Sequence, residues 1–147
     1  MPNTNDVQAI EQQIRKLAKT EEYMSDQQLL LFRNLLEILY KNTVTQIHEA
    51  KEEITKPTDE ADVIDNASIE AEMILKLKII DRQTKLLGKI DEAITMIEQK
   101  TYGYCIETGE PIGIERLLLR PTANLSVDAK SIKEEEEKDY GSATDEE

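Results

Sequence analysis

Apolar residues recur at helical spacing through the first two thirds of the chain and predict three helices. The first is short and amphipathic, over residues 6–19, and the two that follow are long, over 25–56 and 66–100. Ser25 and Gln28 have the spacing of a capping box at the start of the first long helix. Pro57, which lacks a backbone N–H, ends that helix.

The two long helices carry apolar seams that predict an antiparallel coiled coil. On the second helix, one column repeats every seven residues and another runs beside it: Met73, Ile80, Leu87 and Ile94, with Ile90 and Ile97. A short connection joins the two helices, so they must lie antiparallel to bury both seams. At 1.5 Å per residue, this finger is roughly 45–50 Å long.

The pattern changes after residue 100, where glycines, two prolines and short apolar runs predict a compact module. Tyr102–Cys105 and Pro111–Ile114 are the expected hairpin arms, and a last helix is expected from Ser126 to Tyr140. The predicted fold class is mainly α: a long antiparallel coiled-coil hairpin on a small α+β module with a C-terminal helix. The expected units are residues 1–24, packing on the module, the finger 25–100 with its tip near 57–67, the module and C-terminal helix 101–140, and a disordered acidic tail 141–147.

Composition narrows the possible functions. A net charge of −13 makes free DNA or RNA an improbable primary ligand. The single cysteine excludes an intramolecular disulfide and leaves no cysteine-rich metal site. Because no signal peptide or membrane span is evident, we expect a cytoplasmic protein without a membrane partner.

Two charged clusters are candidate binding sites. Asp62 and Asp65 lie in the connection at the end of the finger, where they could chelate Mg²⁺ or meet basic groups of a partner. A solvated turn is the simpler interpretation. Lys78, Arg82, Lys85 and Lys89 recur on one helix face and could bind an anion. The simpler interpretation is a salt-bridged surface, for example Asp81 with Lys85.

Cys105 and His48 do not predict a catalytic site. A structural zinc site needs four Cys or His ligands, and this chain has one of each. Nucleophilic catalysis would need a base beside Cys105, and the sequence shows none. We therefore expect the protein not to be an enzyme.

Three segments resemble the DksA/TraR family of bacterial transcription factors. Asp62-Val-Ile-Asp65-Asn-Ala67 matches that family's DxxDxA tip motif. YGYC, followed by GEPIGIERLLLRPTANL, resembles its C-terminal module, and EEYMSDQQLLLFRNLLE resembles the start of its first coiled-coil helix. The resemblance covers roughly residues 20–135 in unbroken register, which is far more specific than a short motif.

The resemblance implies a protein that binds RNA polymerase and inserts its finger into the secondary channel. Such factors act in the stringent response with guanosine tetraphosphate, repressing ribosomal RNA promoters and activating others. The motif match makes Asp62, Asp65 and Ala67 the tip residues near the polymerase active centre. The family's positions for the alarmone map to Arg82, Leu86, Lys89, Arg120 and Lys130. A monomer without direct sequence-specific DNA binding is expected.

The metal positions depart from the family pattern. Its four zinc-binding cysteines correspond to Cys105, Thr108, Ser126 and Ala129, so the chain resembles the family's zinc-free, cysteine-poor members, and we expect no zinc and no tightly bound cofactor. Apolar packing is expected to hold the module together, by Ile112, Ile114, Leu117, Leu118, Leu125 and Val127.

Two other functions stay open. A factor similar to the Gre transcript-cleavage factors would hold a catalytic Mg²⁺ at its tip and assist RNA hydrolysis by the polymerase. A structural coiled-coil adaptor would be insensitive to changes at the tip.

Overall fold

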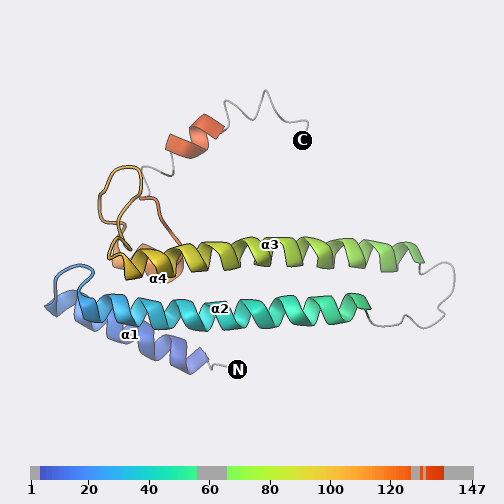
Figure 1. Cartoon of the computed structure of the whole chain (residues 1–147), viewed down its shortest axis with the longest axis horizontal. Helices are drawn as coiled ribbons and strands as arrows, with labels where there is room; N and C mark the ends of the chain where they lie inside the picture. The colour runs from blue at the N-terminus through green and yellow to red at the C-terminus, as the bar shows by residue number, and fades with distance from the viewer. Residues whose placement is uncertain (1–3, 56–65, 127–129, 131, 138–147) are drawn as a thin grey trace.

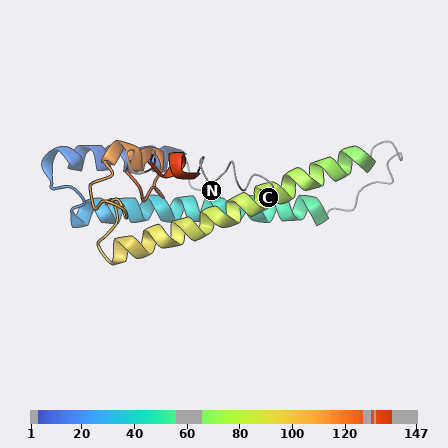
Figure 2. The same ribbon diagram turned by 90° about the horizontal axis from the view of Figure 1, so that it is seen from above.

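The computed structural model describes residues 4–55, 66–126, 130 and 132–137. Its helices are α1 (Thr4–Thr20), α2 (Asp26–Thr55), α3 (Asn66–Glu98) and α4 (Ile114–Leu119). Figures 1 and 2 show α2 and α3 side by side as an antiparallel finger, with α1 and α4 at its base. The fold class is confirmed, and none of the described helices combines the length and apolar character needed to cross a membrane.

The start of α2 is fixed by the residues that the capping pattern singled out. The Gln28 backbone N–H donates to the Ser25 hydroxyl over 3.3 Å. The Met24 N–H donates to the side-chain oxygen of Gln28 over 2.8 Å. In a standard capping box, that oxygen would accept from the N-cap residue itself, here Ser25. Met24 and Leu29 flank this cap, and both are buried in the same cluster, as in a hydrophobic staple.

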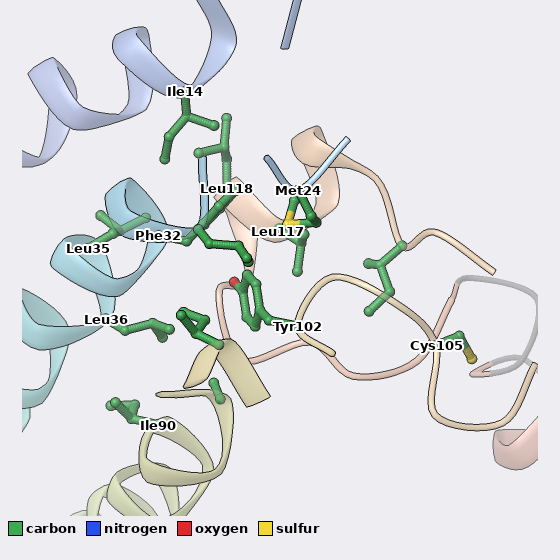
Figure 3. Close-up of a cluster of buried hydrophobic side chains, with 14 residues drawn as sticks. Ile14, Met24, Phe32, Leu35, Leu36, Ile90, Tyr102, Cys105, Leu117 and Leu118 are labelled. Carbon is green, nitrogen blue, oxygen red and sulfur yellow. The ribbon is translucent and has the colours of Figure 1, made fainter. Parts of the chain in front are cut away.

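The core lies at the base of the finger, where α1, the module and both long helices meet (Figure 3). Phe32 of α2 and Tyr102 of the module pack with their ring centroids 5.4 Å apart. The buried cluster that surrounds them draws on all four helices: Ile14, Leu36, Ile90, Leu117 and Leu118 belong to it. The N-terminal helix α1 packs on α2 and on α4. Ile112, Leu117 and Leu118 are buried as expected for the module, Ile114 and Leu125 are partly buried against the core, and Val127 lies outside the described residues.

On α3, the seam is most deeply buried at the base of the finger. Ile90 and Ile97, the secondary heptad column, are buried, whereas Leu87 and Ile94 of the main column are only partly buried. Met73, at the far end, is 39% exposed. The reason is that the base is covered by the module and α1, while the distal finger has only two helices to bury its apolar side chains.

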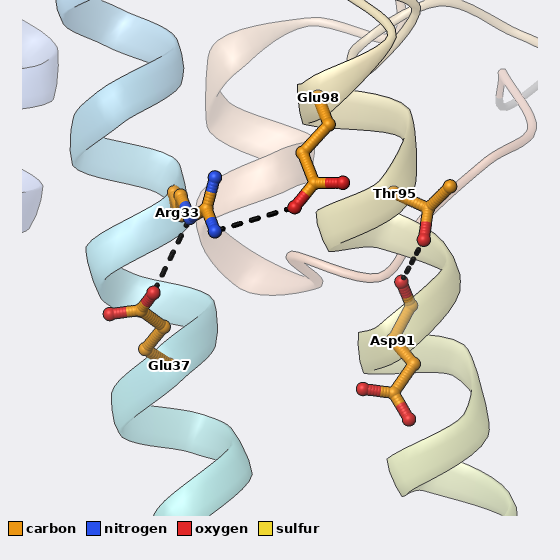
Figure 4. A network of polar contacts seen from close by, with 5 residues as sticks. All are labelled: Arg33, Glu37, Asp91, Thr95 and Glu98. Carbon is orange, nitrogen blue, oxygen red and sulfur yellow. Dashed lines mark hydrogen bonds and ion pairs between the residues drawn. The ribbon is translucent and has the colours of Figure 1, made fainter.

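Polar contacts join the two finger helices along the seam. Arg33 of α2 pairs with Glu37 on its own helix and with Glu98 of α3, 3.4 Å away in each case (Figure 4). Further along, the Gln83 amide donates to the Gln46 amide oxygen. These exposed contacts contribute little to the stability of the finger, because solvent screens surface ion pairs.

The module contains the predicted hairpin in a reduced form. An antiparallel bridge pairs Tyr104 with Pro111, and the Ile112 N–H donates to the Gly103 carbonyl over 2.8 Å. The Tyr23 hydroxyl donates to that same carbonyl and accepts a bond from the Gly113 N–H, so it fastens the hairpin to the segment before α2.

One part of the hairpin prediction was wrong. Ile114 does not extend the second arm but begins α4, a helix that the sequence pattern did not predict. Its six residues are too few for a helical period to stand out, and the burial of Leu117 and Leu118 against the core stabilises the helix.

Replacing Gly88 with alanine is expected to stabilise the folded protein. This glycine lies inside α3, and a Cβ at this position would meet no other atom within 4 Å. Gly88→Ala should therefore raise the free energy of unfolding by about 0.5–1 kcal/mol, measured as a higher urea midpoint with an unchanged slope. Gly103→Ala should do the opposite, because its Cβ would come within 2.7 Å of Met24. A stability loss in Gly88→Ala would contradict the packing described for α3.

Tyr102 predicts how stability changes at alkaline pH. Burial and the nearby Tyr23 phenol raise the pKa of Tyr102 above its ordinary value, and its hydroxyl donates to the Pro121 carbonyl over 2.7 Å. Unfolding frees a tyrosine that ionises near pH 10, so stability present below that pH is lost as the pH rises further.

Tyr102→Phe should lower the free energy of unfolding by about 1 kcal/mol at pH 7, through the lost hydrogen bond. Above pH 10, its stability should fall less steeply than that of the wild type, as followed by circular dichroism in urea. An equally steep alkaline loss in both proteins would contradict the buried, neutral phenol.

Candidate functional site

The predicted tip residues are only partly within the described structure. Asp62 and Asp65 lie outside the described residues, in the connection between α2 and α3. Ala67 lies in the first turn of α3, where it is exposed. The described end of the motif, at Ala67, thus lies at the end of the finger that is opposite to the core.

The basic face predicted from spacing lies on α3. Lys78, Arg82, Lys85 and Lys89 are all exposed. Lys85 pairs with Asp81, 3.1 Å away, as the salt-bridge interpretation predicted for that residue. Within the described part of the chain, the other three form no ion pair, so their charges remain available to a ligand or partner.

Lys89 also borders a cavity of about 270 Å³ between α3 and the module. Residues of α3 and α4 line it, together with Arg120, residues 122–125 and Lys130. Among the described residues, four cationic side chains and one carboxylate line it: Lys89, Arg116, Arg120 and Lys130, with Glu92. Such an excess of Lys and Arg is suited to an anion with several phosphate oxygens, because guanidinium groups bind them through paired hydrogen bonds.

Two hydrogen bonds to backbone carbonyls hold the cavity wall in place. Arg116 Nε donates to the Leu125 carbonyl over 3.1 Å, which fixes the loop after α4. The Ile106 N–H donates to the Asn124 carbonyl over 2.9 Å and joins that loop to the hairpin. The wall therefore depends on the folded module rather than on α3 alone.

The cavity contains three of the five residues that the resemblance assigned to the alarmone: Lys89, Arg120 and Lys130. Arg82 and Leu86 lie on α3 toward the tip and do not line it. Sequence reasoning missed Arg116, whose position follows from the unpredicted helix α4. The i,i+4 spacing of Arg116 and Arg120 in the sequence was the available signal.

Cys105 lies beside residues at two of the other three cysteine-spaced positions. Its side chain is buried, and its sulfur receives hydrogen bonds from the Thr108 hydroxyl and from the backbone N–H groups of Ser126, Thr108 and Glu107. Burial raises the pKa of the Cys105 thiol, but these hydrogen bonds outweigh burial and lower it to about 6. Ala129, the fourth position, lies outside the described residues.

Comparisons with known proteins match nearly the whole of this architecture. Residues 28–97 match the family described as "DnaK suppressor protein DksA, N-terminal domain", and residues 100–135 match the "Prokaryotic dksA/traR C4-type zinc finger". The chain is similar to the RNA polymerase-binding transcription factor DksA of Caulobacter vibrioides, with 41% identity over 122 residues, covering 82% of this chain and 86% of that protein.

Two further relatives give the same result. The RNA polymerase-binding transcription factor DksA of Escherichia coli K12 is 40% identical over 122 residues, covering 80% of this chain and 79% of that protein. The structure of transcription factor DksA2 from Pseudomonas aeruginosa superposes with a TM-score of 0.74 at 40% identity, covering 86% of this chain and 98% of that one.

The match to a C4-type zinc finger contradicts the prediction that zinc is not a cofactor. That prediction relied on the missing cysteines alone, whereas the whole of residues 100–135 belongs to a family of zinc-binding domains, and we correct it accordingly. The described side chains at the family's cysteine positions are one thiol, at Cys105, and two hydroxyls, at Thr108 and Ser126. They do not supply the four thiolates of a C4 zinc site. In the described ranges, no three His, Cys, Asp or Glu side chains converge on one point.

Proposed function

The chain belongs to the DksA family of RNA polymerase-binding transcription factors, and on that premise we propose that it regulates transcription by binding RNA polymerase directly. The observation that carries the proposal is that the similarity runs through the finger and the module, residues 28–97 and 100–135, so both parts of the relatives' architecture are present. A regulator of this kind acts by binding, so we also propose that the chain is not an enzyme and works as a cytoplasmic monomer.

The finger is the part that reaches the polymerase interior. Its 30-residue helix α2 is roughly 45 Å long at 1.5 Å per residue, long enough to extend from a base on the enzyme surface into a channel. The DxxDxA motif lies at its far end, with Asp62 and Asp65 before α3 and Ala67 in its first turn. We assign the secondary channel as the target and the tip as the element that alters open-complex stability.

The cavity at the finger's base is the proposed contact for guanosine tetraphosphate. Lys89, Arg120 and Lys130 line it together with Arg116, which supports an anionic ligand bound between this chain and the polymerase. Such a ligand changes the regulator's action only if it binds one polymerase conformation better than the other. The alarmone then acts by favouring the conformation in which the open complex is less stable.

Asp65→Asn tests the tip. The substitution removes one negative charge far from the core, so the fold and the affinity for polymerase should be unchanged, while inhibition at a ribosomal-RNA-type promoter should be abolished. Asp59→Asn removes the same charge from the same connection, outside the motif, and should keep full inhibition.

In vitro transcription, with polymerase binding measured in parallel, reads out both variants. Full inhibition by Asp65→Asn would refute the tip assignment. Shortened transcripts on adding wild-type protein to stalled elongation complexes would instead favour the cleavage-assisting function.

Lys89→Ala tests the alarmone contact. Loss of one charge-assisted hydrogen bond, about 1.5–3 kcal/mol, should raise the guanosine tetraphosphate concentration for half-maximal potentiation about tenfold or more. Inhibition without the nucleotide should change much less. The matched control is Lys85→Ala, which removes an equal charge from the same helix face but does not border the cavity. Equal losses with and without the nucleotide would contradict the assignment.

A further inference from the structure

The acidic end of the chain begins next to the basic cavity. Residues 134–137 are four consecutive glutamates, and residues 131–147 together carry a net charge of −6. Residues 132–137 are helical and exposed. The Lys130 ammonium, which lines the cavity, pairs with the Glu134 carboxylate at 3.8 Å.

The base of this acidic helix is attached to the module. The Lys130 N–H donates to the carbonyl of the buried Ser126 over 2.9 Å. Lys130 and the glutamates that follow it are therefore placed relative to the cavity wall rather than on a free chain end.

Helical geometry separates the four glutamates into two pairs. At about 100° per residue, Glu134 and Glu137 point within about 40° of Lys130, whereas Glu135 and Glu136 point more than about 100° away from it. Glu137 lies roughly 10 Å further along the helix axis than Lys130, which is about one Debye length at 0.1 M salt, and the Debye length grows as salt is lowered. The first pair therefore lowers the positive potential of the cavity. The second pair carries the same charge but points away, so its substitution is the matched control.

The contact between Lys130 and Glu134 is one that a ligand can displace. The 3.8 Å distance is long for an ion pair, and the order of lysine before glutamate is the weaker orientation on a helix. A phosphate-bearing anion that enters the cavity competes with this carboxylate for the same ammonium group, and it is also repelled by Glu137. Both effects lower the affinity of the cavity for anions.

We propose that Glu134 and Glu137 form a built-in competitor that sets how tightly the cavity binds a polyphosphate anion. The proposal rests on the anion-binding role given to the cavity under the proposed function and adds its regulation. In the absence of ligand, the glutamates partly neutralise Lys130; ligand binding releases them.

The test is a titration of the full-length protein with inorganic pyrophosphate at low salt, followed by the NMR amide signals of Lys89, Arg120 and Lys130. The double variant Glu134→Gln/Glu137→Gln should bind about threefold more tightly than the matched control Glu135→Gln/Glu136→Gln, which has the same net charge. The difference should shrink at high salt, since the competition is electrostatic and screened.

Two outcomes would contradict the proposed competition between the glutamates and the anion. One is equal pyrophosphate affinity of the two double variants, and the other is the lack of pyrophosphate-dependent shifts in all of the proteins at low salt. Potentiation of polymerase by guanosine tetraphosphate is measured separately. If the pyrophosphate affinities differ as expected but the nucleotide has no effect on transcription, the alarmone assignment fails while the competition between anion and glutamate stands.

Discussion

Tyr102 is where the two long helices meet the module that covers them. Its ring packs against Phe32 of α2, and its hydroxyl holds the Pro121 carbonyl in the loop after α4. Two antiparallel helices alone can bury only one stripe each, and this is why the distal finger leaves Met73 exposed. At the base, the module adds a third layer around Tyr102, and the basic cavity lies where residues of this layer approach α3.

Much of this arrangement could be predicted from the sequence. The capping pattern at Ser25 and the heptad spacing on α3 indicated the helices, because local periodicity reports local structure. The relative depth of the two heptad columns could not be predicted, since Ile90 is buried by a module distant in sequence. The helix α4 was missed for the same reason: six residues give too little pattern, and tertiary packing decides their conformation.

The residues of the candidate site also differ in how far the sequence predicted them. Spacing alone placed Lys89 on a basic face, whereas Arg120 and Lys130 came from a family resemblance. Arg116 could be found only from the fold, because it lines the cavity only when the module is packed at the base of the finger. The prediction of no zinc was wrong for a different reason. It relied on individual side chains, whereas residues 100–135 as a whole match a zinc-finger family.

We propose that the finger places its tip beside the polymerase active centre. A photo-crosslinking amino acid at Ala67, with a second variant carrying it in place of Lys16 on α1 as the control for the base, tests this claim in the complex with polymerase. We predict that position 67 crosslinks to segments bordering the active centre and position 16 to the outer surface. Crosslinks from position 67 to the outer surface alone, with binding intact, would contradict it.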